Sequence, residues 1–297
     1  MKVIIKLIVC SCLTIVPFIF YQHSIIISSD PYYSLATKTS NTFITGSSRA
    51  KRGVVPNVLK EQLSLDEMPL NISINGLNSP YGKFYCDFIS KKASKVDNKK
   101  GLFLLAVSPP SIMNKEAEIN DKARESEFYM YDLYSVNVNP NIEYILRRTK
   151  PEIESLKKGD KLYKTIYHPN GWWEAVVDNN TKKKKDKYGK ISFYKSEERE
   201  SYLRNSINNL KEYGEVILIR LPVSNKVFAA EENWFPDFNS YMEELAEGQN
   251  IKFLNYSQLE NDSIYYYDNK SHMDGKSAKF FTQTLSKDIK QILTQDE

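Results

Sequence analysis

Two residues of the chain, Ser48 and His272, have the side chains and the sequence surroundings that nucleophilic catalysis requires. Ser48 follows an apolar run at 43–45 and then Gly46, a pattern that predicts a strand ending at a turn into a helix. A serine hydroxyl is a poor nucleophile at neutral pH until a base accepts its proton, and an imidazole is suited to that task. An ordinary turn, with the serines capping the helix, is the structural alternative.

The segments around these residues alternate between strand and helix patterns. Strands are predicted at 42–45, 69–75, 102–107, 215–221 and 251–256, and helices at 55–65, 81–95, 197–213, 238–248 and 276–293. The continuous apolar run at 102–107 is typical of a central parallel strand covered on both faces. The predicted fold is α/β, a three-layer αβα flavodoxin-like sandwich with a five-stranded parallel sheet. His272 precedes the last helix, so it is predicted at the same sheet edge as Ser48, within hydrogen-bonding reach.

Residues 111–195 interrupt this alternation inside a domain predicted over 41–297. They contain a charged helical piece at 142–156, an aromatic stretch at 167–173 and a lysine run at 182–185. The stretch is too long for an ordinary loop. We interpret it as a lid-like insertion over the sheet edge, because aromatic segments near a cleft often contact ligands. A surface decoration without substrate contact is the alternative.

The N-terminal segment 1–40 is predicted to be a membrane anchor and a short stalk. Residues 3–20 are almost continuously apolar, close to the roughly 20 residues that cross a bilayer. Small residues of a cleavage site do not follow, which favours an uncleaved signal anchor. Lys2 and Lys6 precede the span, and no Lys or Arg follows before Lys38. The positive-inside rule therefore predicts a single-pass protein with a cytoplasmic N-terminus and an extracytoplasmic body.

The composition argues against several classes of function. The net charge is only +4, and basic residues are interspersed with acidic ones, so no nucleic-acid partner is expected. The chain has three cysteines and three histidines, without the spacing of a zinc site. No cofactor and no metal are predicted.

The segment Gly46-Ser47-Ser48, together with a histidine before the last helix, resembles the SGNH (GDSL-type) hydrolase superfamily, especially membrane-anchored SGNH-like proteins of the bacterial cell envelope. The resemblance covers roughly residues 42–110 and 196–293. It implies that Ser48 is the nucleophile and His272 the base. It also implies an oxyanion hole formed by the backbone amides of Ser48 and Gly76.

The chain departs from the family pattern at two points. The family's acid lies three residues before the histidine, where this chain has Asn269, while Asp268 is one residue further away. Either Asp268 orients His272 through a local bulge, or Asn269 holds the imidazole without stabilising its charge. The family's Gly-x-Asn after the third strand is also absent, and its place is taken by Val107-Ser108-Pro109. The candidate substitutes are three residues, Asn78, Asn114 and Arg49.

Arg220 ends the fourth predicted strand at the same sheet edge. It is predicted either to bind an anionic group of a substrate or to form an ion pair with Glu231 or Glu232. Arg49, Asn78 and Arg220 are accordingly the candidate substrate-binding residues.

Two functions follow from these residues. The first is an extracytoplasmic serine esterase or O-acyltransferase that acts on ester-bearing carbohydrates or other acylated envelope substrates through an acyl-Ser48 intermediate. The second is an inactive SGNH scaffold for binding or assembly in the envelope, favoured by the two departures. The reactivity of Ser48 distinguishes them.

Overall fold

The structure is a computed structural model that describes residues 2–30, 32–74, 81–96, 100–115, 136–147, 163–177, 193–259, 263–268 and 270–295. Five parallel strands form the central sheet in the order β2-β1-β3-β8-β9. They are β1 Thr42–Thr45, β2 Leu70–Asn71, β3 Gly101–Ala106, β8 Gly214–Arg220 and β9 Lys252–Asn255. Counted along the chain, this is the flavodoxin-like order 2-1-3-4-5. The predicted fold class is confirmed.

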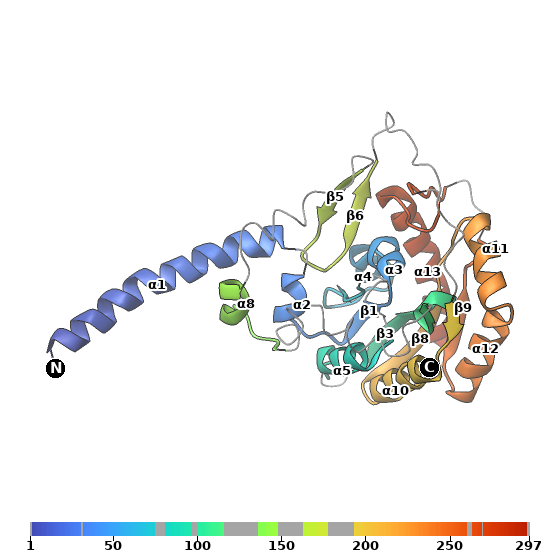
Figure 1. The fold of residues 1–297 in the computed structure, drawn as a ribbon, viewed down its shortest axis with the longest axis horizontal. Helices are drawn as coiled ribbons and strands as arrows, with labels where there is room; N and C mark the ends of the chain where they lie inside the picture. The colour runs from blue at the N-terminus through green and yellow to red at the C-terminus, as the bar shows by residue number, and fades with distance from the viewer. Residues whose placement is uncertain are drawn as a thin grey trace.

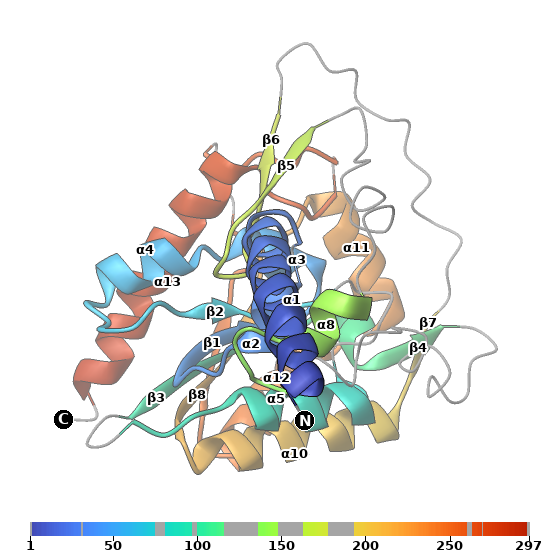
Figure 2. The same ribbon diagram turned by 90° about the vertical axis from the view of Figure 1, so that its left-hand side faces the viewer.

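Helices cover both faces of the sheet (Figures 1 and 2). One layer contains α5 Lys83–Lys92, α10 Glu197–Lys211 and α12 Phe238–Gly248, and the other contains α3 Ser48–Gly53, α4 Pro56–Gln62 and α13 Gly275–Gln295. Strand β3 shows why both layers are needed. Phe103 and Leu105 lie in the first hydrophobic core, and Leu102 and Leu104 lie in the second. Alternate side chains of a strand point to opposite faces, so an all-apolar strand requires a cover on each side.

The helices of the body differ from the sequence pattern at two further points. The helix predicted to follow the turn at Ser48 is short, since α3 has six residues, and helix α11 Asn225–Trp234 is not predicted. The buried side chains of α11 are Val227 and Glu231, so this helix carries no apolar stripe that periodicity would detect. Strand β2 is also shorter than the predicted 69–75, with two residues in the ladder.

The described parts of the insertion lie close to the body. Its two ends pair as antiparallel strands, β4 Met113–Lys115 with β7 Phe193–Lys195. Between them lie α8 Ile142–Arg147 and a hairpin of β5 Lys164–Tyr167 and β6 Trp173–Val176. Strand β6 packs against α3 and α13, which brings the aromatic stretch next to the helix that begins at Ser48. The lysine run and the remainder of the predicted helix 142–156 lie outside the described residues.

Helix α1, Lys2–Ser29, extends away from the body (Figure 1). Its residues Lys2–Ile26 are long and apolar enough to cross a membrane. The segment that follows, predicted as a stalk, instead contains α2 Tyr33–Thr37, with Leu35 and Ala36 in the first hydrophobic core. The Tyr33 hydroxyl also hydrogen-bonds His23 Nδ1 of α1 at 2.8 Å. The apolar side chains of α2 therefore make the segment after α1 part of the folded body.

Candidate active site

The turn between β1 and α3 places Ser48 at the carboxyl edge of the sheet. Gly46 has φ +139°, and a Cβ at this position would lie 2.7 Å from Cβ of Ala106 on the neighbouring strand. Only glycine fits this conformation and this close approach. Ser47 then caps α3 by accepting a hydrogen bond from the Arg49 amide at 3.4 Å. Ser48 is the first residue of the helix, with a partly exposed side chain.

Ser48, His272 and Asp268 form a continuous hydrogen-bonded relay. Ser48 Oγ lies 2.8 Å from His272 Nε2, and His272 Nδ1 lies 2.6 Å from Asp268 Oδ2. An ionised carboxylate only accepts hydrogen bonds, so Nδ1 carries the ring proton and donates a hydrogen bond to Asp268. Nε2 is then free to accept the hydrogen bond from the Ser48 hydroxyl. Ser48 and His272 are 224 residues apart in the chain.

The loop before α13 explains how an aspartate four residues ahead of the histidine reaches its ring. Asp268 Oδ1 accepts hydrogen bonds from the amides of Lys270, Ser271 and His272 at 2.9, 3.1 and 3.2 Å. This compact turn returns the chain onto the carboxylate. Of the two residues considered to orient the imidazole, Asp268 makes the contact, while Asn269 lies outside the described residues.

The same contacts keep Asp268 ionised. Burial by itself raises the pKa of Asp268, but the hydrogen bond and charge of His272, with the backbone amides, outweigh it and lower the pKa to about 2. A carboxylate with so low a pKa remains negative throughout the neutral range. It can therefore stabilise a positive charge on His272 without itself accepting the proton.

This depressed pKa predicts an acid-dependent contribution to stability. The pKa of Asp268 is about 2 in the folded chain, against about 3.9 for a free aspartate. Its stabilising contribution is thus complete above about pH 4 and is lost as the pH falls toward 2. Urea unfolding of the unmodified protein and of Asp268→Asn, both in detergent, measures this effect. We expect the difference between their free energies of unfolding to shrink as the pH falls through this interval. A difference that stays constant with pH would contradict the predicted linkage.

Aromatic and apolar residues hold His272 in place. The Tyr267 ring stacks near the imidazole, with centroids 6.0 Å apart and an interplanar angle of 25°. The Tyr267 amide also donates a hydrogen bond to the carbonyl of His272 at 3.2 Å. The next residue, Met273, is buried, and its methyl group lies where a side chain at Gly53 of α3 would be. The loop that carries His272 is therefore packed directly against the helix that carries Ser48.

The predicted oxyanion donors are only partly described. The amide of Ser48 is at the first position of α3, where a helix offers it no intrahelical acceptor. Gly76 and Asn78 lie outside the described residues. Asn114 lies in β4, opposite Tyr194 of β7.

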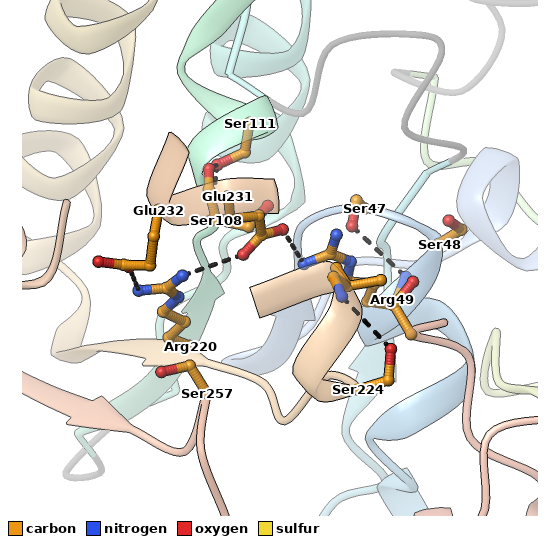
Figure 3. A network of polar contacts seen from close by, with 12 residues as sticks. Ser47, Ser48, Arg49, Ser108, Ser111, Arg220, Ser224, Glu231, Glu232 and Ser257 are labelled. Atoms are coloured by element: carbon orange, nitrogen blue, oxygen red, sulfur yellow. Dashed lines mark hydrogen bonds and ion pairs between the residues drawn. The ribbon is translucent and has the colours of Figure 1, made fainter. Parts of the chain in front are cut away.

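The side chains of Arg49 and Arg220 both pair with the carboxylate of Glu231 (Figure 3). Glu231 lies between them, 2.6 Å from Arg49 Nη1 and 3.0 Å from Arg220 Nη2, and its side chain is fully buried. Arg220 also contacts Glu232 at 3.8 Å and hydrogen-bonds Asn239. Of the two predictions for Arg220, anion binding and an ion pair, its side chain makes the ion pair and is 1% exposed.

Two further cations, Lys51 and Arg52, lie on α3 and are not among the residues predicted from the sequence. Both are buried. Their spacing from Ser48, three and four residues, is that of one helix face. This signal requires knowing that α3 is a helix, and a six-residue segment with little apolar content does not show that by itself.

Comparisons with known proteins add little to this geometry. No protein-family model matches the chain, and no curated protein matches it. Among solved structures, the chain is similar to a carbohydrate acetylesterase family member from Sinorhizobium meliloti. That similarity has a TM-score of 0.38 and 11% sequence identity, and it covers 85% of this chain and 99% of the other.

Proposed function

We propose that this protein is a serine hydrolase of the SGNH type, an esterase or O-acyltransferase with Ser48, His272 and Asp268 as its catalytic residues. The observation that carries the proposal is the unbroken relay from Ser48 Oγ through His272 to Asp268, at 2.8 and 2.6 Å. The fixed orientation of the imidazole, with Nε2 toward the serine, is what general-base catalysis requires.

In the proposed reaction, Ser48 Oγ attacks the carbonyl carbon of an ester while His272 Nε2 takes the hydroxyl proton. The carbonyl oxygen becomes an oxyanion, which the Ser48 amide is placed to stabilise together with the predicted donor Gly76. The bond to the alcohol then breaks, and the alcohol leaves with the proton held by His272. Water, or a sugar hydroxyl in a transferase, next attacks the acyl carbon while His272 takes its proton. The bond between the acyl carbon and Ser48 Oγ then breaks, His272 returns the proton to Oγ, and the free acid or the acylated sugar leaves.

We further propose that the substrate is an acylated carbohydrate or another acylated component of the cell envelope. Helix α1 supports this, because Lys2–Ile26 can anchor the chain in a membrane. With Lys2 and Lys6 at its start, the positive-inside rule places the body on the extracytoplasmic side. Identification of the product, free acid or acylated sugar, distinguishes hydrolysis from transfer.

A fluorophosphonate probe tests the proposal on the full chain in detergent. We expect a covalent adduct on Ser48, located by peptide mass spectrometry, because the probe reacts with serines activated by a base. Ser48→Ala should abolish the adduct. The matched control is Ser47→Ala, which removes the neighbouring hydroxyl and a weak helix cap, and should retain it. Folded protein that forms no adduct, or an adduct lost in Ser47→Ala and retained in Ser48→Ala, would overturn the assignment and favour the inactive scaffold.

A further inference from the structure

Arg52 is buried, and among the described residues it forms no ion pair with a carboxylate. Its side chain lies among three aromatic rings, with Cζ 5.1 Å from the centroid of Tyr163 and 5.6 Å from those of Trp173 and Tyr267. The residue is 9% exposed, and its Nη1 is buried without a hydrogen-bond partner. Burying an unpaired N–H donor is costly, so this donor requires an explanation, and an acceptor from a bound molecule is one.

Cation–π contacts alone do not account for this arrangement. Aromatic rings interact with the face of a guanidinium, whereas its N–H donors lie in the plane and need acceptors. Arg220 offers a comparison within the same protein. It is also buried and close to two rings, yet it is paired with Glu231 and Asn239. Arg220 thus has a carboxylate and an amide oxygen as acceptors, although its Nε also lacks a partner, whereas among the described residues Arg52 has no carboxylate acceptor.

Two more donors lie at the same aromatic cluster. Lys51 is 2% exposed, and its Nζ lies 5.5 Å from the Trp173 ring centroid and donates a hydrogen bond to the carbonyl of Asn71 at 3.2 Å. Burial lowers the pKa of Lys51 to about 7, which an anion nearby would reverse. The indole Nε1 of Trp173 is likewise buried without a partner. Two cations thus lie at the Trp173 ring, next to an unpaired indole N–H, and neither cation forms an ion pair with a described carboxylate.

The cluster adjoins the catalytic residues. Ser48 and Arg52 are four residues apart on α3, a spacing that brings their Cβ atoms to roughly 6 Å on one helix face. The Tyr267 ring contacts both His272, at 6.0 Å, and the Arg52 guanidinium, at 5.6 Å. Tyr163 and Trp173 come from the insertion. An anion bound at Arg52 would therefore belong to a molecule that also reaches Ser48.

We propose that Arg52, assisted by Lys51 and Trp173, binds an anionic group of the acylated substrate, a carboxylate or a phosphate. The inference rests on the proposed function, since it names the class of ester that reaches Ser48. A guanidinium binds carboxylate and phosphate through paired N–H donors, which suits both groups. The substrate class is thereby an ester on an acidic sugar or on a phosphate-containing polymer, in preference to a neutral polysaccharide.

Competitive inhibition of p-nitrophenyl acetate hydrolysis tests this with three ligands of similar size. Benzoate carries a carboxylate, phenyl phosphate carries a phosphate, and benzamide is the neutral control. We expect at least one anion to inhibit the full chain more strongly than benzamide, and the stronger anion identifies the group. Arg52→Gln should raise the inhibition constant of that anion about 10- to 100-fold, the range for loss of a charge-assisted contact, and that of benzamide far less.

Two further variants keep the outcome interpretable. Arg52→Lys retains the charge but loses the planar fork, and it should give an intermediate loss. Arg204→Gln, on α10 and paired with Glu200 at 2.9 Å, removes an arginine elsewhere and should change none of the inhibition constants. The proposal is overturned if neither anion inhibits the unmodified protein better than benzamide, a result that needs no variant to fold. Equal effects of Arg52→Gln on anion and benzamide would overturn it as well.

The experiments can reject the proposed function and the anion site independently of each other. If the protein hydrolyses no ester, the same three ligands are titrated against the tryptophan fluorescence of the full chain. Anion binding that Arg52→Gln abolishes would then support the anion site while the hydrolase assignment falls. If the probe labels Ser48 but neither anion binds better than benzamide, the hydrolase assignment stands and the anion site is rejected.

Discussion

Asp268→Asn is expected to lower kcat of ester hydrolysis by about 10⁴-fold. Asp268 Oδ2 accepts the hydrogen bond of His272 Nδ1 at 2.6 Å, which leaves Nε2 unprotonated toward Ser48. An asparagine can present its NH₂ group to Nδ1, and the ring then adopts the other tautomer, in which Nε2 carries the proton and cannot act as base. The measurement is kcat with p-nitrophenyl acetate for both proteins in detergent.

The matched control for this substitution is Asp274→Asn. Asp274 is on the other side of His272, and its Oδ1 accepts a hydrogen bond from the Ser277 amide at 2.9 Å at the start of α13. Asparagine keeps an oxygen that can accept this hydrogen bond, so both the stability of the loop and kcat should remain nearly unchanged. A small effect of Asp268→Asn, comparable to that of Asp274→Asn, would contradict a role for Asp268 in orienting the imidazole.

Glu231→Ala is expected to lower the free energy of unfolding by about 3–5 kcal/mol. The Glu231 side chain is fully buried and pairs with Arg49 at 2.6 Å and Arg220 at 3.0 Å. Removing it leaves two poorly hydrated guanidinium groups without their shared carboxylate. Because Arg49 directly follows Ser48, the substitution should also disturb the turn that presents the nucleophile. Urea unfolding followed by circular dichroism measures the loss.

The adjacent acid supplies the control. Glu232 lies 3.8 Å from Arg220 with a side chain 34% exposed, so Glu232→Ala should cost about 1 kcal/mol or less. If both substitutions have the same small effect, then Glu231 does not hold the two arginines together. The double variant Glu231→Ala/Arg49→Met tests the cause of the loss. If it loses less unfolding free energy than Glu231→Ala alone, the cause is the unpaired charge of Arg49.

The strands and the Ser48–His272 contact could both be predicted from the sequence, because both depend on the burial of a parallel sheet. Strand β3 is buried on both faces, so every residue in it is apolar. The strands next to it are also covered by helices on both faces, which favours apolar residues there as well. Once the sheet is parallel, the end of β1 and the loop before α13 must share an edge, whatever lies between them in the chain. The 2.8 Å contact between Ser48 and His272 agrees with that placement.

Other features of the site depend on contacts that sequence spacing does not encode. The choice of Asp268 rests on a turn in which one carboxylate oxygen accepts three successive amides. Helix α11 buries a carboxylate where a typical helix buries an apolar side chain, so its pattern is hidden. The burial of Arg52 depends on aromatic residues from the insertion and from the histidine loop, which meet only in the fold.

The C-terminal end of α1 packs against the body, and this limits how far the body can lie from a membrane. Ile26 of α1 is 1% exposed within the first hydrophobic core, and α2 begins at Tyr33, so few residues separate the apolar helix from the folded domain. With α1 in a membrane, as we propose, only the short stretch between Ser29 and Tyr33 would separate the anchor helix from the first helix of the body. Ser48 would then work at a nearly constant height above the lipid surface. Acylated polymer would have to enter that thin layer to react, so the distance of an ester from the membrane would decide which groups are modified.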